Sequence, residues 1–427
     1  MESSSKRSEP RNLDRLSELP DSLILNIFEF LPMNDVVSTQ ILSRRCKNLW
    51  ITTPYLHFDC KSAADCDKFR HFVSLALLCW SGKRIQKFKL SNLTFSDKSL
   101  ISDVVLWVRF AVDNGVEELE TTSFKFTGNL YTDSYRVPNC LYSCSSLQKL
   151  SFLGDVNGIN GNLVQWNQLK WLKLLCLKEG TQDEIDLVLS GIPMLEVFEF
   201  IFIQDNNSSL NFRSNSLKAL YVYMSMRHKD GMSKDTELRI WTPNLEILDI
   251  RGGTSKIHHV WVTRSQIIPT MRHVKGLTLT HHFIQILGFE ACKGLIPPSM
   301  SVVFLSLYGS FEEHIYTVGL LEILPKLKKL VIVDHESKYV DPNRKSFKPN
   351  SSKPFLVELR TVDITWNTRD FSIFPLIEIM LRCASKLEKM VFRVKRTVPP
   401  SELILTSQTK LLRMPRSSPN AELICEI

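Results

Sequence analysis

The chain has 427 residues, 44% hydrophobic and 23% charged, which is a core-forming composition too apolar for wholesale disorder. Its net charge is +8, and +7 of this comes from residues 321–427, with 19 basic against 12 acidic side chains. Because no dense basic stripe, no apolar run of roughly 20 residues and no N-terminal apolar signal is present, we expect neither nucleic acid nor membrane as a partner.

Residues 16–50 predict three short helices. Pro20 stiffens the entry to the first helix, Asp21 or Ser22 can cap it, and Pro32 ends it. Asn34 or Asp35 can cap the second helix, and Ser43 opens the third. Apolar residues recur at helical spacing in the first helix at Leu23, Ile24, Ile27, Phe28 and Leu31. Three helices of this size bury little surface alone, so we expect this head to complete its core against a partner.

The run LSELPDSLILNIFEFLPMNDVVSTQILSRRCKNLW resembles an F-box, although Cys46 stands where many family members carry Trp. An ordinary three-helix start to a globular domain is the alternative. The resemblance implies an F-box at residues 13–60, after a tail at 1–12 that we expect to be disordered. It also implies contact with a Skp-family adaptor through Leu16, Leu19, Pro20, Leu23, Ile27, Phe28, Leu31, Pro32, Leu42 and Trp50.

The rest of the chain carries a repeated hexamer with the pattern apolar-x-x-apolar-x-apolar. Its three apolar positions are filled in 35 of 36 cases, Thr121 being the exception, and the intervals between hexamers run from 22 to 32 residues. The hexamers start at Ile85, Val116, Leu147, Leu169, Leu195, Leu217, Leu245, Val274, Val302, Leu327, Leu359 and Leu387. The alternating end of each hexamer predicts a half-buried strand.

Segments such as 183–193 and 374–385 between the hexamers predict helices. One strand and one helix per 22–32 residues is the leucine-rich repeat unit, and stacked units share a continuous core. The predicted fold class is therefore α/β, a three-helix head followed by a solenoid whose parallel strands line the concave side. We expect the residues at equivalent positions of consecutive repeats to form buried layers, namely Leu248, Leu277 and Leu305, and Ile250, Leu279 and Leu307.

The body resembles the leucine-rich repeat region of plant F-box proteins in the phrases VPNCLYSCSSLQKLSF, LSGIPMLEVFEF and TPNLEILDI. The segments LRTVDITWN, LRCASKLEKMVF and RMPRSSPNAELI resemble the C-terminal FBD-type region of that group. The resemblance implies a solenoid at residues 61–353 and an FBD-like region of further repeats at 354–427.

The sequence contains none of the glycine-rich, nucleophile-elbow or zinc-protease motifs of common enzymes. Its ten cysteines form no CxxC pair, so we expect free thiols, no metal site and no cofactor. The pairs His258–His259 and His281–His282 lie out of phase in their repeats, and we interpret them as surface or capping residues. The lysine-rich segment 337–354 predicts a solvated loop, with docking of an acidic segment as the alternative.

In each repeat, the third and fifth positions of the hexamer and the residue that follows the hexamer should point out of the core. They include Lys173 and Asp249, and a set rich in residue types that dominate binding surfaces. We predict this set as the substrate surface: Trp171, Tyr221, Tyr223, Arg251, Phe304 and Tyr308.

The resemblance implies a non-catalytic substrate-recognition subunit of an SCF-type ubiquitin ligase, in the nucleus and/or cytoplasm. The adaptor would connect it to a cullin and a RING subunit, and the substrate would be an unknown protein. Two alternatives stay open. One is a scaffold that uses the F-box outside a ligase. The other is a small-molecule receptor in the concavity, which would need a cluster of inward-facing Lys and Arg.

Overall fold

A computed structural model of the chain describes residues 19–60, 66–95, 98–122, 125–126, 137–152, 164–176, 182–204, 208–226, 236–252, 260–262, 272–294, 300–309, 311, 314–334, 355–366, 373–394 and 409–426. The predicted tail at 1–12, Leu16 and the loop at 337–354 lie outside these residues. The chain divides into two compact units, Met1–Phe152 (unit 1) and Leu153–Ile427 (unit 2).

Unit 1 joins the three-helix head to the first strands of a parallel sheet. The head consists of α1 (Asp21–Phe28), α2 (Met33–Ser38) and α3 (Arg44–Leu49), with 3-10 turns at Thr39–Ile41 and Trp50–Thr52. The sheet follows in the order β1 (Tyr55–Asp59), β2 (Lys87–Ser91), β4 (Glu118–Thr122) and β6 (Lys149–Phe152). The connections contain α4 (Cys66–Cys79), α5 (Lys98–Asp113), α6 (Asn139–Tyr142) and the paired strands β3 (Thr94–Phe95) and β5 (Lys125–Phe126).

The head is fastened to the repeats inside unit 1. The indole Nε1 of Trp80, at the end of α4, donates a hydrogen bond of 2.8 Å to the Thr53 carbonyl, and the Ser81 amide donates to the Ile51 carbonyl at 2.7 Å. Leu56 and Phe58 of β1 are buried in the core of the unit. The head therefore shares a core with the first repeats.

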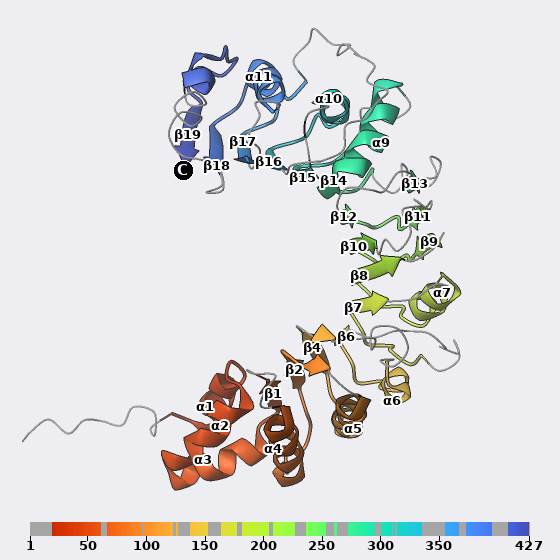
Figure 1. The fold of residues 1–427 in the computed structure, drawn as a ribbon, viewed down its shortest axis with the longest axis vertical. Coiled ribbons are helices and arrows are strands. Elements are labelled where there is room, and N and C mark those ends of the chain that lie inside the picture. Colours follow the sequence, from red (N-terminus) through yellow and green to blue (C-terminus); the bar gives the residue numbers. More distant parts are fainter. Residues whose placement is uncertain are drawn as a thin grey trace, which may run out of the picture. The chain divides into compact units, whose positions relative to one another are not determined.

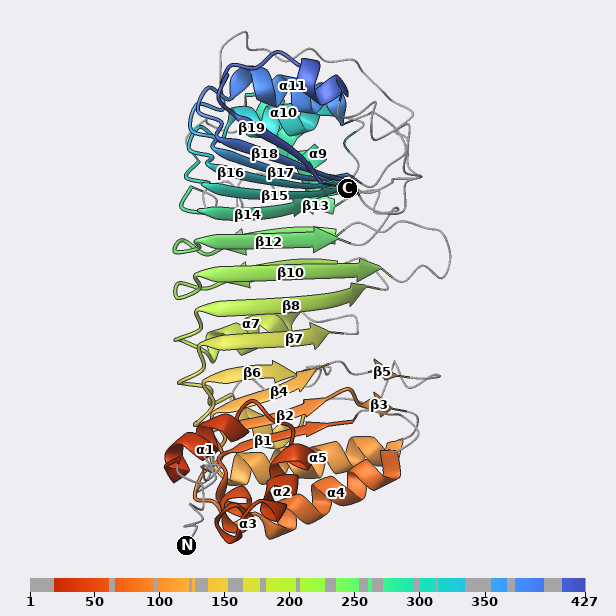
Figure 2. The same cartoon turned by 90° about the vertical axis from the view of Figure 1, so that its left-hand side faces the viewer.

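Unit 2 is built on a parallel sheet whose described strands pair in chain order. They are β7 (Trp171–Cys176), β8 (Val197–Gln204), β10 (Ala219–Met226), β12 (Ile247–Gly252), β14 (Gly276–Thr280), β15 (Phe304–Gly309), β16 (Lys329–Asp334), β17 (Thr361–Trp366), β18 (Lys389–Val394) and β19 (Glu422–Glu426). Figure 2 shows these strands stacked side by side. Because β17, β18 and β19 pair onward from β16, these three strands continue the repeat sheet.

A second layer covers one face of this sheet. It contains the helices α7 (Gln182–Ser190), α9 (His281–Cys292), α10 (His314–Glu322) and α11 (Phe374–Cys383). It also contains a small parallel sheet of β9 (Ser208–Arg213), β11 (Thr236–Trp241) and β13 (Val260–Val262). In Figure 1 these elements lie on one side of the unit 2 strands. We call the opposite side, which carries no helix among the described residues, the open face.

The predicted repeat frame is confirmed. Each of the twelve hexamers contains a strand that begins two residues after the hexamer does. Leu248 pairs with Leu277 and Leu277 with Leu305, and all three are at most 1% exposed. The next layer, Ile250, Leu279 and Leu307, is buried in the same way. Thr121 fills its apolar position because it is buried and its hydroxyl donates to the Ser151 carbonyl at 3.1 Å.

Two expectations need correction. Repeats around β8, β10 and β12 carry a strand where a helix was expected, since the buried residues Leu210, Phe212, Leu238 and Ile240 alternate with a period of two. The predicted caps of the first two helices are also wrong. Prolines occupy both N-cap positions without a side-chain hydrogen bond, whereas Ser43 caps α3 by accepting from the Cys46 amide at 3.1 Å.

Candidate functional site

Apolar side chains of the head lie on its surface as well as in its core. Helix α1 is apolar on two sides: Ile24 and Phe28 are buried, while Leu23 and Ile27 are 47% and 39% exposed. Leu42 is 60% exposed, and Pro20 is also exposed. Sequence reasoning did not include Phe30 and Ile41, which are 81% and 84% exposed. Uncovered apolar groups at this density in so small a head are typical of a protein-docking surface.

The other residues predicted to contact an adaptor lie deeper or outside the described chain. Half-buried positions are Leu19, Leu31, Pro32 and Trp50. Phe28 is only 2% exposed, which assigns it to the head's own core, and Leu16 lies outside the described residues.

Arg45 holds the start of α1 against α3. Its guanidinium forms an ion pair with Asp21 and donates a hydrogen bond of 2.6 Å to the Leu19 carbonyl. Asp21 therefore belongs to a tertiary contact and not to a helix cap. This contact fixes the backbone beside Pro20, and with it the position of the exposed groups of α1.

The open face of unit 2 brings together all six residues of the predicted substrate surface. Parallel pairing in register places them in rows that cross the strands. The first row is Trp171, Val197, Ala219, Ile247, Gly276, Phe304, Lys329, Thr361, Lys389 and Glu422. Tyr221 lies in the next row with Lys173, Glu199 and Asp249. Tyr223, Arg251 and Tyr308 lie two residues further along their strands, on the same face. None of the six is buried.

Arg251 is the centre of a compact cluster on this face. Its Nε and Nη2 donate to the two carboxylate oxygens of Asp249 at 2.9 and 2.8 Å. The guanidinium carbon also lies 5.5 Å from the Tyr223 ring centroid and 4.7 Å from that of Tyr308. Asp249 points towards the open face as predicted, but it is only 4% exposed. We call Tyr223, Asp249, Arg251 and Tyr308 the Arg251 cluster.

The electrostatics of the cluster keep it neutral as a whole. Burial, and then the nearby Asp249 carboxylate, raise the pKa of Tyr223 to about 12. Burial and then Asp249 also raise the pKa of Tyr221. The hydrogen bonds to Asp249 raise the pKa of Arg251. At neutral pH the face therefore presents two neutral phenols and a compensated cation, a surface suited to aromatic stacking and hydroxyl hydrogen bonds.

In unit 1 the corresponding strands carry a network of charges in place of aromatic groups. Lys149 donates to Glu120 at 2.6 Å. Burial alone would raise the pKa of Glu120, but this hydrogen bond and the positive charges of Lys149, Lys87 and Lys89 together lower it. Burial, and then the positive charge of Lys89, lower the pKa of His57, whose Nε2 lies 3.1 Å from the Ser91 hydroxyl.

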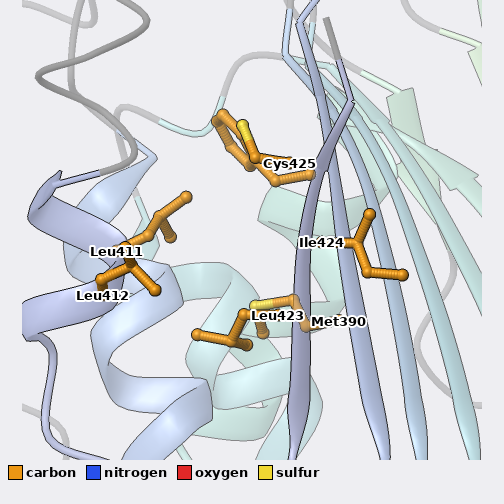
Figure 3. A pocket seen from close by; sticks show the side chains of 7 residues that line it. Met390, Leu411, Leu412, Leu423, Ile424 and Cys425 are labelled. Atoms are coloured by element: carbon orange, nitrogen blue, oxygen red, sulfur yellow. The ribbon is translucent and has the colours of Figure 1, made fainter.

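An apolar pocket of ≈ 330 Å³ lies near the last described strands (Figure 3). It is lined by Met390, Phe392, Leu411, Leu412, Leu423, Ile424 and Cys425. Leu411 and Leu412 come from the helical turn at 409–413, and Ile424 lies on the other side of β19 from them. The lining contains no Lys or Arg, so it does not supply the basic cluster that the small-molecule hypothesis requires.

Other chemistry is sparse in the part of the chain that the structure describes. No group of three or more His, Cys, Asp or Glu within it could hold a metal ion. The nine cysteines whose side chains the structure describes are free thiols. His258 and His259 lie outside the described residues, while His281 starts α9. None of the described helices is both long enough and apolar enough to span a bilayer.

Comparisons with known proteins agree with this architecture. The F-box domain model matches residues 16–57, and the model for the LRR repeats of FBD-associated F-box protein At5g56370 matches residues 104–332. F-box/FBD/LRR-repeat protein At5g56420 of Arabidopsis thaliana is 31% identical over 257 residues, 58% of this chain and 58% of that protein. FBD-associated F-box protein At5g60610 of the same plant is 27% identical over 396 residues, 85% of this chain and 96% of that protein.

Among solved structures, the leucine-rich repeat-containing protein LegL7 from Legionella pneumophila matches with a TM-score of 0.35 and 14% identity. The match covers 76% of this chain and 97% of that one. The repeat model alone spans more than half of the chain, and the F-box model covers the head. The chain therefore belongs to the leucine-rich-repeat family of FBD-associated F-box proteins.

Proposed function

We propose that this chain is the substrate-recognition subunit of an SCF-type ubiquitin ligase. The head binds a Skp-family adaptor, which connects the chain to a cullin and a RING subunit. The open face of unit 2 binds a protein substrate. The observation that carries the proposal is that an F-box head with an uncovered apolar surface occurs in one chain with a repeat sheet whose open face presents aromatic groups.

The two sides of α1 have different roles in the proposed adaptor binding. Ile24 and Phe28 face inward and hold the helices together, whereas Leu23 and Ile27 remain free to fill pockets on a partner. Burying such side chains stabilises a complex by about 1.5–3 kcal/mol each. Phe28 contributes indirectly, because it positions the helix that carries the contact residues.

The role in ubiquitin transfer is proximity. The chain forms no covalent intermediate with ubiquitin; it holds a substrate lysine near a charged conjugating enzyme and raises the effective concentration of the two reactants. Trp171, Tyr221, Tyr223, Arg251, Phe304 and Tyr308 are the proposed substrate contacts. We propose the nucleus and/or cytoplasm as the site of action.

The adaptor surface is tested with Leu19→Ala plus Pro20→Ala, and with Leu23→Glu plus Ile27→Glu. Each double variant should weaken adaptor binding by about 30-fold or more in titration calorimetry, because it removes or charges an apolar contact. The matched control is Leu75→Glu plus Leu78→Glu, which charges two exposed apolar residues of α4 in the same unit and should leave affinity unchanged. Undiminished adaptor binding by both head variants would overturn the assignment.

Copurification and substrate-binding measurements separate the two alternatives from this proposal. A scaffold outside a ligase would purify with the adaptor but without the cullin. A small-molecule receptor would bind substrate only with its ligand in the concavity, so exhaustively dialysed chain would not bind substrate. Copurification of adaptor and cullin, with substrate binding retained after exhaustive dialysis, is the expected result.

A further inference from the structure

The first row of the open face changes its chemistry halfway across unit 2. From β7 to β15 its residues are apolar: Trp171, Val197, Ala219, Ile247, Gly276 and Phe304. From β16 to β18 they are Lys329, Thr361 and Lys389. Ile247 and Phe304 are 42% and 36% exposed, so the apolar half of the row is accessible to a partner.

The two lysines of this row differ from the other cations that face the same side. Lys173 is paired with Glu199, Arg251 with Asp249, and Arg393 with both Asp363 and Glu426. Lys329 and Lys389 are exposed, and neither has a carboxylate partner within the described part of the chain. Their positive charge is therefore available to a ligand.

The surroundings reinforce this charge. Lys326 and Lys328 are exposed in the turn before β16, and Arg360 lies beside Lys328 through a backbone hydrogen bond of 2.9 Å. Two acids of the same edge are engaged, Glu388 with Arg360 at 3.0 Å and Glu358 with Lys386 at 2.5 Å, and Glu422 lies in register beside Lys389 at the end of the row. Among the described residues of this edge, the positive charge is in excess.

The spacing of the row defines the length of a ligand. Neighbouring strands lie about 4.8 Å apart, so Lys329 and Lys389 flank Thr361 across about 10 Å, and the apolar half spans about 24 Å. An extended segment at about 3.3 Å per residue covers the apolar half with about seven residues and the basic half with about three. The Lys329 ammonium lies 5.8 Å from the Phe304 ring centroid, so the two halves are continuous.

We propose that the open face of unit 2 recognises a protein segment with two parts, an apolar stretch over β7–β15 followed by carboxylate side chains over Lys329 and Lys389. This inference rests on the proposed function and names the class of substrate segment. The anionic group is a carboxylate and not a phosphate. The available cations are lysines acting as point charges, while Arg251 and Arg393, whose forked guanidinium groups suit phosphate, are committed to internal carboxylates.

The test is a selection from a displayed library of random 16-residue peptides on the full chain, followed by titration of the enriched peptides. Since the readout needs neither adaptor nor ubiquitin, failure of the proposed ligase role would not affect it. We expect enriched peptides in which an apolar block adjoins two or more Asp or Glu. Lys329→Glu plus Lys389→Glu should weaken their binding by at least about tenfold, and affinity should fall with added salt.

Two controls separate this site from a general effect of charge. Lys218→Glu plus Lys275→Glu makes the same change in net charge at two exposed lysines that pair with Glu196 and Glu246, and it should leave binding unchanged. Lys329→Met plus Lys389→Met should weaken binding without introducing repulsion. A peptide with Lys in place of its acids should recover affinity for the Lys→Glu variant.

Three results would overturn the proposal. One is the absence of any enriched peptide, and another is enrichment of peptides that lack acidic residues. The third is binding only after phosphoserine replaces the acidic residues, which would identify a phosphate site instead.

Discussion

Arg251 and Asp249 depend on each other on the open face. The carboxylate is almost entirely covered, and the two hydrogen bonds from Arg251 are what balance its charge. Removing one partner of such a pair leaves an uncompensated charge, whereas removing both does not. The tyrosine rings on either side hold the guanidinium in place for this role.

We expect Arg251→Ala to lower the free energy of unfolding by about 1–3 kcal/mol, because it leaves the Asp249 carboxylate unpaired. The double variant Asp249→Ala plus Arg251→Ala should lose less than Arg251→Ala alone. Urea unfolding measures both. Lys218→Ala, which breaks an exposed ion pair, is the control and should cost less than about 1 kcal/mol. Additive losses in the double variant would show that the pair is not coupled.

Helices α9 and α10 pack at a close approach that only glycine allows. A Cβ at Gly288 would lie 2.0 Å from the Tyr316 carbonyl oxygen, and one at Gly319 would lie 2.4 Å from the Cys292 sulfur. The obstacle at Gly288 is backbone, which cannot rotate away. This contact sets the spacing of the two helices, and so the spacing of the repeats that contain β14 and β15.

Gly288→Ala should therefore destabilise unit 2 by about 1–3 kcal/mol, since the added methyl group forces the helices apart. The matched change Gly276→Ala lies in the neighbouring strand β14, where the nearest atom to the new Cβ would be 3.8 Å away, and it should be tolerated. Thermal unfolding followed by circular dichroism compares the two. Equal midpoints for both variants would contradict this account of the helix contact.

The sheet was predictable from sequence because every strand of the repeat hexamers has one face in a shared core, which imposes a fixed apolar pattern. The small sheet of β9, β11 and β13 was missed, although Leu210 and Leu238 recur at an interval of 28 residues. These strands have six residues or fewer and occupy the place of the repeat helix. The prediction of one strand and one helix per repeat therefore did not include them.

The candidate site was predictable only in part. Alternation along a strand placed Tyr221, Tyr223 and Arg251 on the open face, but the burial of Asp249 depends on the stacking of Arg251 against Tyr308, two strands away. In the head, spacing identified α1 without showing which apolar side would be its own core. Both sides of that helix carry large aliphatic groups, so the choice depends on packing against α2 and α3.

At the scale of the whole molecule, adaptor binding and substrate binding should be separable by mutation. Tyr221→Ala plus Tyr223→Ala should leave adaptor affinity intact and abolish substrate ubiquitination in a reconstituted assay, because aromatic contact area is lost only on the open face. Lys389→Glu plus Arg393→Glu is the paired variant. Loss of ubiquitination in that variant alone would show that the aromatic groups are not the receptor surface.

The junction between the head and β1 has a consequence for how receptors of this kind can be recombined. A chimaera cut after residue 60 would separate Leu56 and Phe58 from the strands and helices that bury them, and would break the hydrogen bond between Trp80 and Thr53. A cut at the boundary between the two compact units, after Phe152, keeps these contacts together, which a cut after the F-box does not. Each substrate face gained by such an exchange would therefore follow the same first repeats, those of unit 1.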